Sequence, residues 1–171
     1  METWRHLRAI ALCPGVVTVV VPALLVGWGR ELHVGWNLTG GLVVLPVVLG
    51  AALIVAGLGL VVWTVRLFAS VGDGTLAPWD PASRLVVRGP YRHVRNPMIG
   101  GVVLLLLGEA ALLGSLAVLL WSLGVFAVNA VYLPLVEEPG LRRRFGEDYE
   151  TYSANVRRWV PRIRPWEPER A

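Results

Sequence analysis

Two polar clusters interrupt an otherwise apolar chain, and both carry side chains suited to binding a ligand. The first reads G-P-Y-R-H-V-R-N-P-M over residues 89–98, and the second is the adjacent pair Glu137 and Glu138. Tyr91 offers a flat face to an adenine or a sulfonium, and Asn96 can donate and accept hydrogen bonds. The two carboxylates suit a cationic or hydroxyl-rich ligand. If the clusters meet in the fold, they form a cofactor site.

Each cluster also has a simpler explanation in which it binds nothing. A basic turn beside a membrane contacts lipid headgroups, and an acidic pair can mark the point where a span leaves the bilayer. The same holds for Gly57-Leu58-Gly59, because small residues let helices pack closely and this motif lies inside an apolar stretch, unlike a phosphate-binding loop. The combination of residue types within 89–98, rather than any one residue, indicates a site.

The composition is that of a membrane protein. The chain has 171 residues, of which 55% are hydrophobic and only 16% are charged, a pairing that is unusual for a soluble domain. Its 16 basic residues are all arginine and leave a net charge of +4. Arginines that flank spans contact anionic lipid, so we expect no nucleic acid partner. One cysteine and 3 scattered histidines predict neither a disulfide nor a bound metal.

Long uncharged stretches predict an all-α, polytopic membrane protein of one domain, residues 1–171, with about four transmembrane helices. The first stretch is long for a signal peptide and lacks a cleavage site, so we expect a retained span. Glycines and prolines predict a cytosolic loop, and apolar residues at helical spacing predict an amphipathic helix on the membrane near the C-terminus. The predicted spans are 9–29, 38–66, 98–113 and 116–136, with the loop at 70–97 and the C-terminal helix at 138–158.

The apolar stretch 98–136 is too long for one span and contains a single charge, Glu109. Gly114-Ser115 is the natural break, which predicts two helices in a tight hairpin. By helical rise, Glu109 lies about 16 Å into the first of them, near the middle of the membrane. An ionisable group at that depth is either functional or a neutral or paired structural residue, and Asn129 is a candidate partner.

Arginine is distributed unevenly about the predicted spans. With four spans and a cytoplasmic N-terminus, every arginine except Arg30 lies on the cytoplasmic side. Positive residues prefer that side, so both termini are predicted to be cytoplasmic, in a bacterial inner membrane. The loop 70–97 and the C-terminal helix then share one face, and the two polar clusters can meet.

The order and spacing of several short motifs resemble a family of integral-membrane methyltransferases. This family includes isoprenylcysteine carboxyl methyltransferase and phosphatidylethanolamine/phospholipid N-methyltransferase. The resemblance covers most of residues 50–165, and no single motif carries it alone. The matching motifs are Gly57-Leu58-Gly59, G-D-G-T-L-A-P at 72–78, L-V-V-R-G-P-Y-R-H-V-R-N-P-M at 85–98, E-E-P-G-L-R-R-R-F-G-E-D-Y-E-T-Y at 137–152 and V-P-R at 160–162.

The resemblance implies S-adenosylmethionine as the methyl donor, enclosed by the cytosolic loop and the C-terminal helix. It also implies cofactor contacts, residue by residue. Those that match the phospholipid branch are Gly57, Gly59, Glu137 and Glu138. Those that match the isoprenylcysteine branch are Arg84, Leu85, Val86, Tyr91, Asn96, Pro97, Met98 and Ile99.

The implied reaction is methyl transfer at the cytosolic membrane face to a small or lipid-like acceptor. An amine, a thiol and a carboxylate all stay open as acceptors. Leu133 stands where the isoprenylcysteine branch has a substrate-binding arginine, so a carboxylate acceptor lacks its natural partner. Two other functions stay open: an NADPH-dependent membrane reductase of related fold, and a non-catalytic membrane protein with a decayed site.

Overall fold

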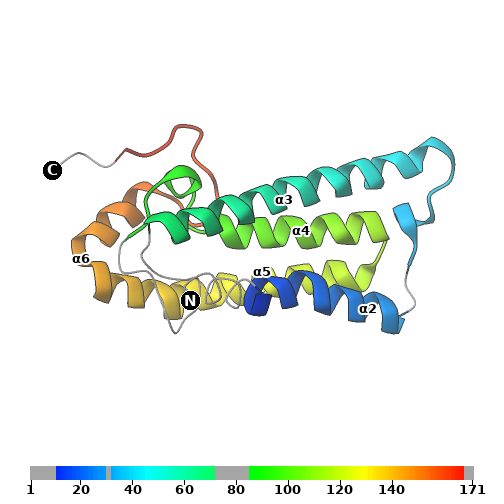
Figure 1. Ribbon diagram of the computed structural model, residues 1–171, viewed down its shortest axis with the longest axis horizontal. Coiled ribbons are helices and arrows are strands. Elements are labelled where there is room, and N and C mark those ends of the chain that lie inside the picture. Colours follow the sequence, from blue (N-terminus) through cyan, green and yellow to red (C-terminus); the bar gives the residue numbers. More distant parts are fainter. Residues whose placement is uncertain (1–10, 30–31, 72–84, 168–171) are drawn as a thin grey trace.

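The computed structural model describes residues 11–29, 32–71 and 85–167, and all regular structure within them is helical (Figure 1). This confirms the predicted all-α class. Arg84, a predicted cofactor contact, lies outside the described residues. In chain order the helices are η1 (Ala11–Val20), α2 (Val21–Gly29), η2 (Val34–Asn37), η3 (Gly40–Val43), α3 (Val44–Val71), η4 (Gly89–Arg92), α4 (Pro97–Leu113), α5 (Leu116–Tyr132), η5 (Leu133–Glu137) and α6 (Glu138–Asn155).

The apolar helices lie side by side along the long axis of the molecule (Figure 1). The chain is therefore a polytopic membrane protein, as predicted. α3 extends past the predicted end at residue 66, because the sequence from there to Val71 contains neither glycine nor proline. The shorter apolar helix is α4, and the stretches long and apolar enough to cross a membrane are Gly15–Asn37, Gly40–Phe68 and Leu116–Asn155.

α3 and α4 are antiparallel, and glycines line their contact. Gly50 and Gly57 of α3 face Gly108 and Gly101 of α4, respectively. A Cβ at Gly57 would lie 2.6 Å from the carbonyl oxygen of Gly101, and one at Gly50 would lie 2.8 Å from that of Gly108. A side chain at these positions would collide with backbone, so only glycine permits such close packing. We call these four residues the glycine seam.

The glycine seam gives Gly57 a packing role that needs no ligand. Gly59 is exposed, and a Cβ there would meet no described heavy atom within 4 Å. The two glycines of the G-x-G motif therefore have different surroundings. Their cofactor contacts stay predictions.

The first span begins as a π-helix, η1, and continues into α2. In a π-helix each carbonyl accepts from the amide five residues later, and for Val17 that residue is Pro22, which has no N–H. The Val17 carbonyl instead accepts a hydrogen bond from the indole N–H of Trp121 on α5, at 3.0 Å. This bond attaches the first span to α5.

α4 and α5 form the predicted hairpin at Gly114-Ser115. Gly114 has a left-handed φ of 62°, which ends α4 in the way glycine commonly ends helices. The hydroxyl oxygen of Ser115 accepts a hydrogen bond from the N–H of Val118 at 3.3 Å, so Ser115 caps α5.

Glu109 lies one turn before the end of α4, midway between the middle of the helix and its last residue. Its Oε2 is buried and has no hydrogen-bond partner among the described residues. Asn129 donates to the carbonyl of Val125 within its own helix, at 2.8 Å. Asn129, the candidate partner, does not pair with Glu109, because the hairpin places it about 13 Å farther along the bundle by helical rise.

α6 is broken at Gly146, whose φ of 51° and ψ of -129° are not helical. Its first part continues the axis of α5 through η5, and its second part turns across the end of the bundle (Figure 1). The predicted interfacial helix 138–158 therefore consists of two pieces and ends earlier, at Asn155. Glycine supplies the break because it tolerates this backbone conformation.

We predict that Gly57→Ala destabilises the protein and that Gly59→Ala does not. The added methyl group at residue 57 meets backbone atoms of Gly101 and Leu105 at 2.6 and 2.7 Å, and overpacking of this kind costs about 1–3 kcal/mol. Thermal unfolding in detergent measures the difference. Equal midpoints for the two variants would refute the packing role of the glycine seam.

Candidate functional site

The two polar clusters meet at one end of the bundle. Arg95 of the first cluster lies with its Nη1 3.3 Å from Oε1 of Glu138. This end also carries α6 and the last described residues, whereas the α4–α5 hairpin lies at the opposite end (Figure 1). The fold therefore places side chains that are distant in sequence in one charged junction.

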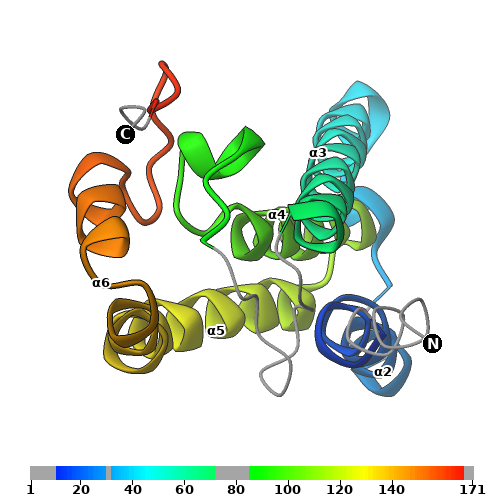
Figure 2. The same cartoon turned by 60° about the vertical axis from the view of Figure 1, so that its left-hand side comes forward.

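Residues 156–167, which we call the C-terminal strap, run beside residues 85–96, which we call the loop segment. Figure 2 shows the strap in red between α6 and the green loop segment. Three backbone hydrogen bonds of 2.9 Å join them, from the N–H groups of Arg95, Arg162 and Trp166 to the carbonyls of Arg157, His93 and Arg92, respectively. The strap thereby fixes the backbone on which Tyr91 and Arg95 stand.

Side chains add to this attachment. Arg92 donates through Nε to the carbonyl of Trp166 at 2.8 Å and pairs through Nη2 with Glu167 at 2.6 Å. Nδ1 of His93 lies 2.7 Å from the carbonyl oxygen of Arg162, so this nitrogen is the donor. At the other end of the strap, Trp159 packs against Phe126 of α5 with ring centroids 5.0 Å apart.

Glu138 is buried and is held by two arginines. Arg158 donates through Nε to Oε1 at 2.6 Å and through Nη2 to Oε2 at 3.0 Å, a two-pronged geometry that fits a carboxylate. Burial raises the pKa of Glu138, but the hydrogen bond from Arg158 and the charges of Arg95, Arg158 and Arg142 outweigh it and leave the pKa below its ordinary value. The carboxylate is thus charged and fully engaged by protein.

Glu137 differs from its neighbour because the residue as a whole is exposed and pairs with no described cation. Burial of its carboxyl group, and then the charge of Glu138, raise its pKa. It lies at the end of η5, where the apolar helix passes into α6. The acidic pair is therefore divided: Glu138 is ion-paired with protein cations and has a lowered pKa, whereas Glu137 has a raised pKa. Only Glu137 is placed to meet a ligand without first giving up an ion pair.

Tyr91 is buried at the centre of the loop segment. Its ring packs in a T-shaped arrangement with that of Phe68, near the end of α3, at a centroid distance of 5.7 Å and an angle of 83°. Its carbonyl accepts a hydrogen bond from the hydroxyl of Tyr152 at 2.8 Å. Burial raises the pKa of the Tyr91 phenol, and Tyr152 and Glu137 raise it further, so the phenol stays neutral and Glu137 lies near it.

The N-terminus of α4 follows the loop segment directly in the chain. Asn96 is its N-cap residue but makes no side-chain capping bond within the described chain; its amide instead donates to the carbonyl of Arg158 at 3.4 Å. Pro97 begins the helix, and the N–H groups of Met98 and Ile99 have no acceptor within its first turn. Such free amides suit an anionic group.

Arg95 adds positive charge next to this helix terminus. Its Nη1 also reaches the hydroxyl of Tyr149 at 3.3 Å, and its Nε is buried with no hydrogen-bond partner among the described residues. A buried guanidinium donor without a partner is costly. Arg95 was not predicted as a site residue, although it stands within the basic motif.

Leu85 and Val86 have packing roles in the structure. Val86 is buried, and Leu85 packs against a cluster formed by Tyr149, Tyr152 and Val156. Their cofactor contacts stay predictions, as do those of the other residues named from the sequence. What the fold adds is proximity: Tyr91, Asn96–Ile99, Glu137 and Glu138 are all brought to the same end of the bundle.

Sequence reasoning missed Arg158 and the tyrosines of α6 as parts of this junction. Tyr149 and Tyr152 recur at helical spacing with other apolar residues, so the sequence did indicate that they lie on the buried face of α6. Arg158 is one of many arginines in the tail, and nothing in the sequence marks which of them faces Glu138. The kink at Gly146 decides that, because it returns the chain toward the loop segment.

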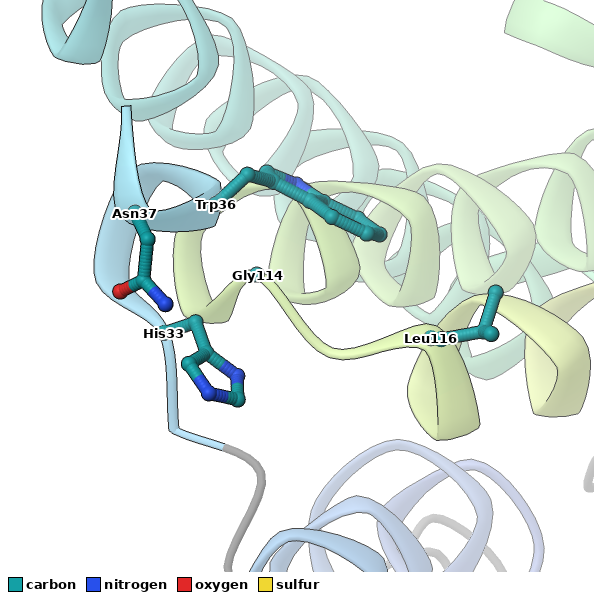
Figure 3. Close-up of a pocket in the computed structure, with 5 residues that line it drawn as sticks. All are labelled: His33, Trp36, Asn37, Gly114 and Leu116. Carbon is teal, nitrogen blue, oxygen red and sulfur yellow. The ribbon is translucent and has the colours of Figure 1, made fainter. Parts of the chain in front are cut away.

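An open cavity of about 320 Å³ lies at the opposite end of the bundle. Figure 3 shows its lining by His33, Trp36, Asn37, Gly114 and Leu116. None of the residues predicted to bind the cofactor lines this cavity. It belongs to the hairpin end and is separate from the charged junction.

The sequence model of the phospholipid methyltransferase family matches residues 45–148, more than half of the chain. The matched region contains the glycine seam, the loop segment and the acidic pair, and it ends before the strap. No curated protein and no solved structure matches the chain.

We predict that Tyr152→Phe destabilises the junction. The substitution leaves the buried carbonyl of Tyr91 without its donor, which costs about 1–3 kcal/mol. Tyr132→Phe is the matched control, because the Tyr132 side chain is exposed. Thermal unfolding in detergent should show a lower midpoint for Tyr152→Phe alone; a shift of similar size in both variants would contradict the role of this bond.

Proposed function

The chain belongs to the phospholipid methyltransferase family, and on that premise we propose that it transfers methyl groups from S-adenosylmethionine to a lipid-like acceptor. Membership of this family identifies the chain as a methyltransferase, and its apolar helices identify it as an integral membrane protein. The donor, the acceptor and the cytoplasmic orientation of the charged junction are our proposals. They rest on the chemistry of the residues gathered there.

One observation carries the proposal. The loop segment, the N-terminus of α4 and the acidic pair meet at one end of the bundle, joined by the contact of Arg95 with Glu138. This end brings together the buried ring of Tyr91, helix amides that have no intrahelical acceptor, and the carboxylate of Glu137. These groups suit a ligand that has a flat base for the aromatic ring, an anionic group for the helix amides and a cationic group for the carboxylate.

S-adenosylmethionine has those three parts, and it supplies a methyl group carried on a sulfonium. The residues present fit it. The amides of Met98 and Ile99 suit the carboxylate of its amino acid part, and Arg95 adds positive charge beside them. Glu137 suits the ammonium or the ribose hydroxyls. Tyr91 stays the proposed aromatic partner of the adenine or the sulfonium; its ring is buried against Phe68, so the loop segment must shift for the ligand to reach it.

The protein's part in the reaction is alignment and exclusion of water. A bond forms between the acceptor and the methyl carbon as the carbon–sulfur bond breaks, and positive charge leaves the sulfur. An amine acceptor must be neutral when it attacks, so its ammonium form loses a proton first. The carboxylate of Glu137 can take that proton when it is not bound to the donor's ammonium, because it forms no ion pair with a described residue and its pKa is raised by burial.

An amine on a lipid is the acceptor that the site favours. Leu133 is buried and apolar, so no cation stands there to hold a carboxylate acceptor. The apolar helices that surround the junction would let a lipid approach sideways from the bilayer while the donor enters from the aqueous side. The family's own description points to phospholipids in the same way.

We predict that the purified protein in detergent binds S-adenosylmethionine and that Glu137→Gln weakens the binding about tenfold, or about 1.4 kcal/mol. Loss of the negative charge removes one partner of the donor's cationic or hydroxyl groups. Glu147→Gln is the matched control, because Glu147 is an exposed acid farther along α6. Calorimetry measures the affinities.

Transfer of a labelled methyl group then identifies the acceptor. Phospholipids with an amine headgroup should be labelled in preference to thiols and prenylated carboxylates. A folded protein that binds no S-adenosylmethionine would overturn the proposed donor. Binding of NADPH in its place would favour a reductase, and labelling of carboxylates alone would overturn the proposed acceptor.

A further inference from the structure

Arg158 stands at the crossing of the three segments that build the junction. Its guanidinium makes two bonds to Glu138, at the start of α6. Its carbonyl accepts from Asn96, the N-cap residue of α4. Arg158 therefore joins the strap to α6 through its side chain and to the loop segment through its backbone.

Glu138 also contacts Arg95, so the position of Arg95 depends on the bond between Arg158 and Glu138. The same oxygen, Oε1, lies 2.6 Å from Nε of Arg158 and 3.3 Å from Nη1 of Arg95. The side chains of Glu138 and Arg95 are only 9% and 12% exposed, so a loss of this pairing leaves charge in a poorly hydrated place. Removing one member of a buried ion pair disturbs the others strongly.

We propose that Arg158 is a positioning residue for donor binding, acting through Glu138. By engaging Glu138 it keeps Arg95 and the N-terminus of α4 in place, and it leaves Glu137 as the acid that faces the ligand. This inference rests on the proposed function. It goes beyond it because Arg158 lies in the strap, outside the region that the family match covers.

The test compares two ways of weakening the strap. Arg158→Lys keeps the positive charge but cannot make the two-pronged bond. Glu167→Gln removes the exposed ion pair with Arg92, which also attaches the strap but does not touch Glu138. If attachment of the strap were all that mattered, both variants would behave alike.

We expect Arg158→Lys to weaken binding of S-adenosylmethionine about tenfold, and Glu167→Gln to leave it within twofold of the wild-type protein. Hydrogen exchange at the amides of Arg95 and Gly100 should quicken in Arg158→Lys alone, because these report the loop segment and the first turn of α4. Equal effects of the two variants, or wild-type behaviour of Arg158→Lys, would overturn the proposal.

A double variant isolates the route of the effect. If Arg158 acts through Glu138, then Glu138→Gln combined with Arg158→Lys should bind the donor no more weakly than Glu138→Gln alone, since coupled residues are not additive. Additive losses would overturn the proposal. A wild-type protein that binds no donor overturns the proposed function instead, and the exchange comparison still decides whether Arg158 positions the junction.

Discussion

The charged junction depends on one carboxylate. Glu138 lies where an apolar helix ends, and it is engaged by Arg158 from the strap and by Arg95 from the loop segment. A buried charge of this kind is tolerated only when it is paired and hydrogen-bonded. The charge of Glu138 is therefore compensated only when the loop segment, α6 and the strap come together. The backbone bonds between strap and loop segment, and the bond from Tyr152 to the carbonyl of Tyr91, complete a frame around the ligand-facing groups.

A second constraint acts inside the membrane. The glycine seam brings the backbones of α3 and α4 into contact, and so sets the position of the α4 N-terminus relative to the end of α3. Gly89 packs against Trp63 and Leu67 of α3, and Tyr91 meets Phe68. The apolar helices thus hold one side of the junction, while the strap holds the other. Near this junction lie the first-turn amides of α4 and the carboxylate of Glu137, which are the groups that we propose to bind the donor.

The division of the acidic pair gives each carboxylate a separate role. Adjacent residues on a helix point in different directions, so Glu138 turns toward the arginines while Glu137 stays exposed. Glu138 is a poor base, because its ion pairs lower its pKa. The same ion pairs make it a good structural anchor. Glu137 is the better base of the two, because burial of its carboxyl group and the charge of Glu138 raise its pKa. The family match places the chain among phospholipid methyltransferases, and this division suggests how such a chain can use two neighbouring acids without competition between them.

The sequence by itself determined the class of the protein. Uncharged stretches long enough to cross a bilayer predicted the helices, Gly114-Ser115 predicted the hairpin, and the distribution of arginine predicted that the polar clusters share a face. These features are local or additive along the chain, so pattern reveals them. Tertiary structure alone decided which arginine meets Glu138, that Gly57 packs against Gly101 whereas Gly59 does not, and that α6 bends at Gly146. Each of these depends on which surfaces come into contact after the helices pack, and residue type and spacing do not specify that.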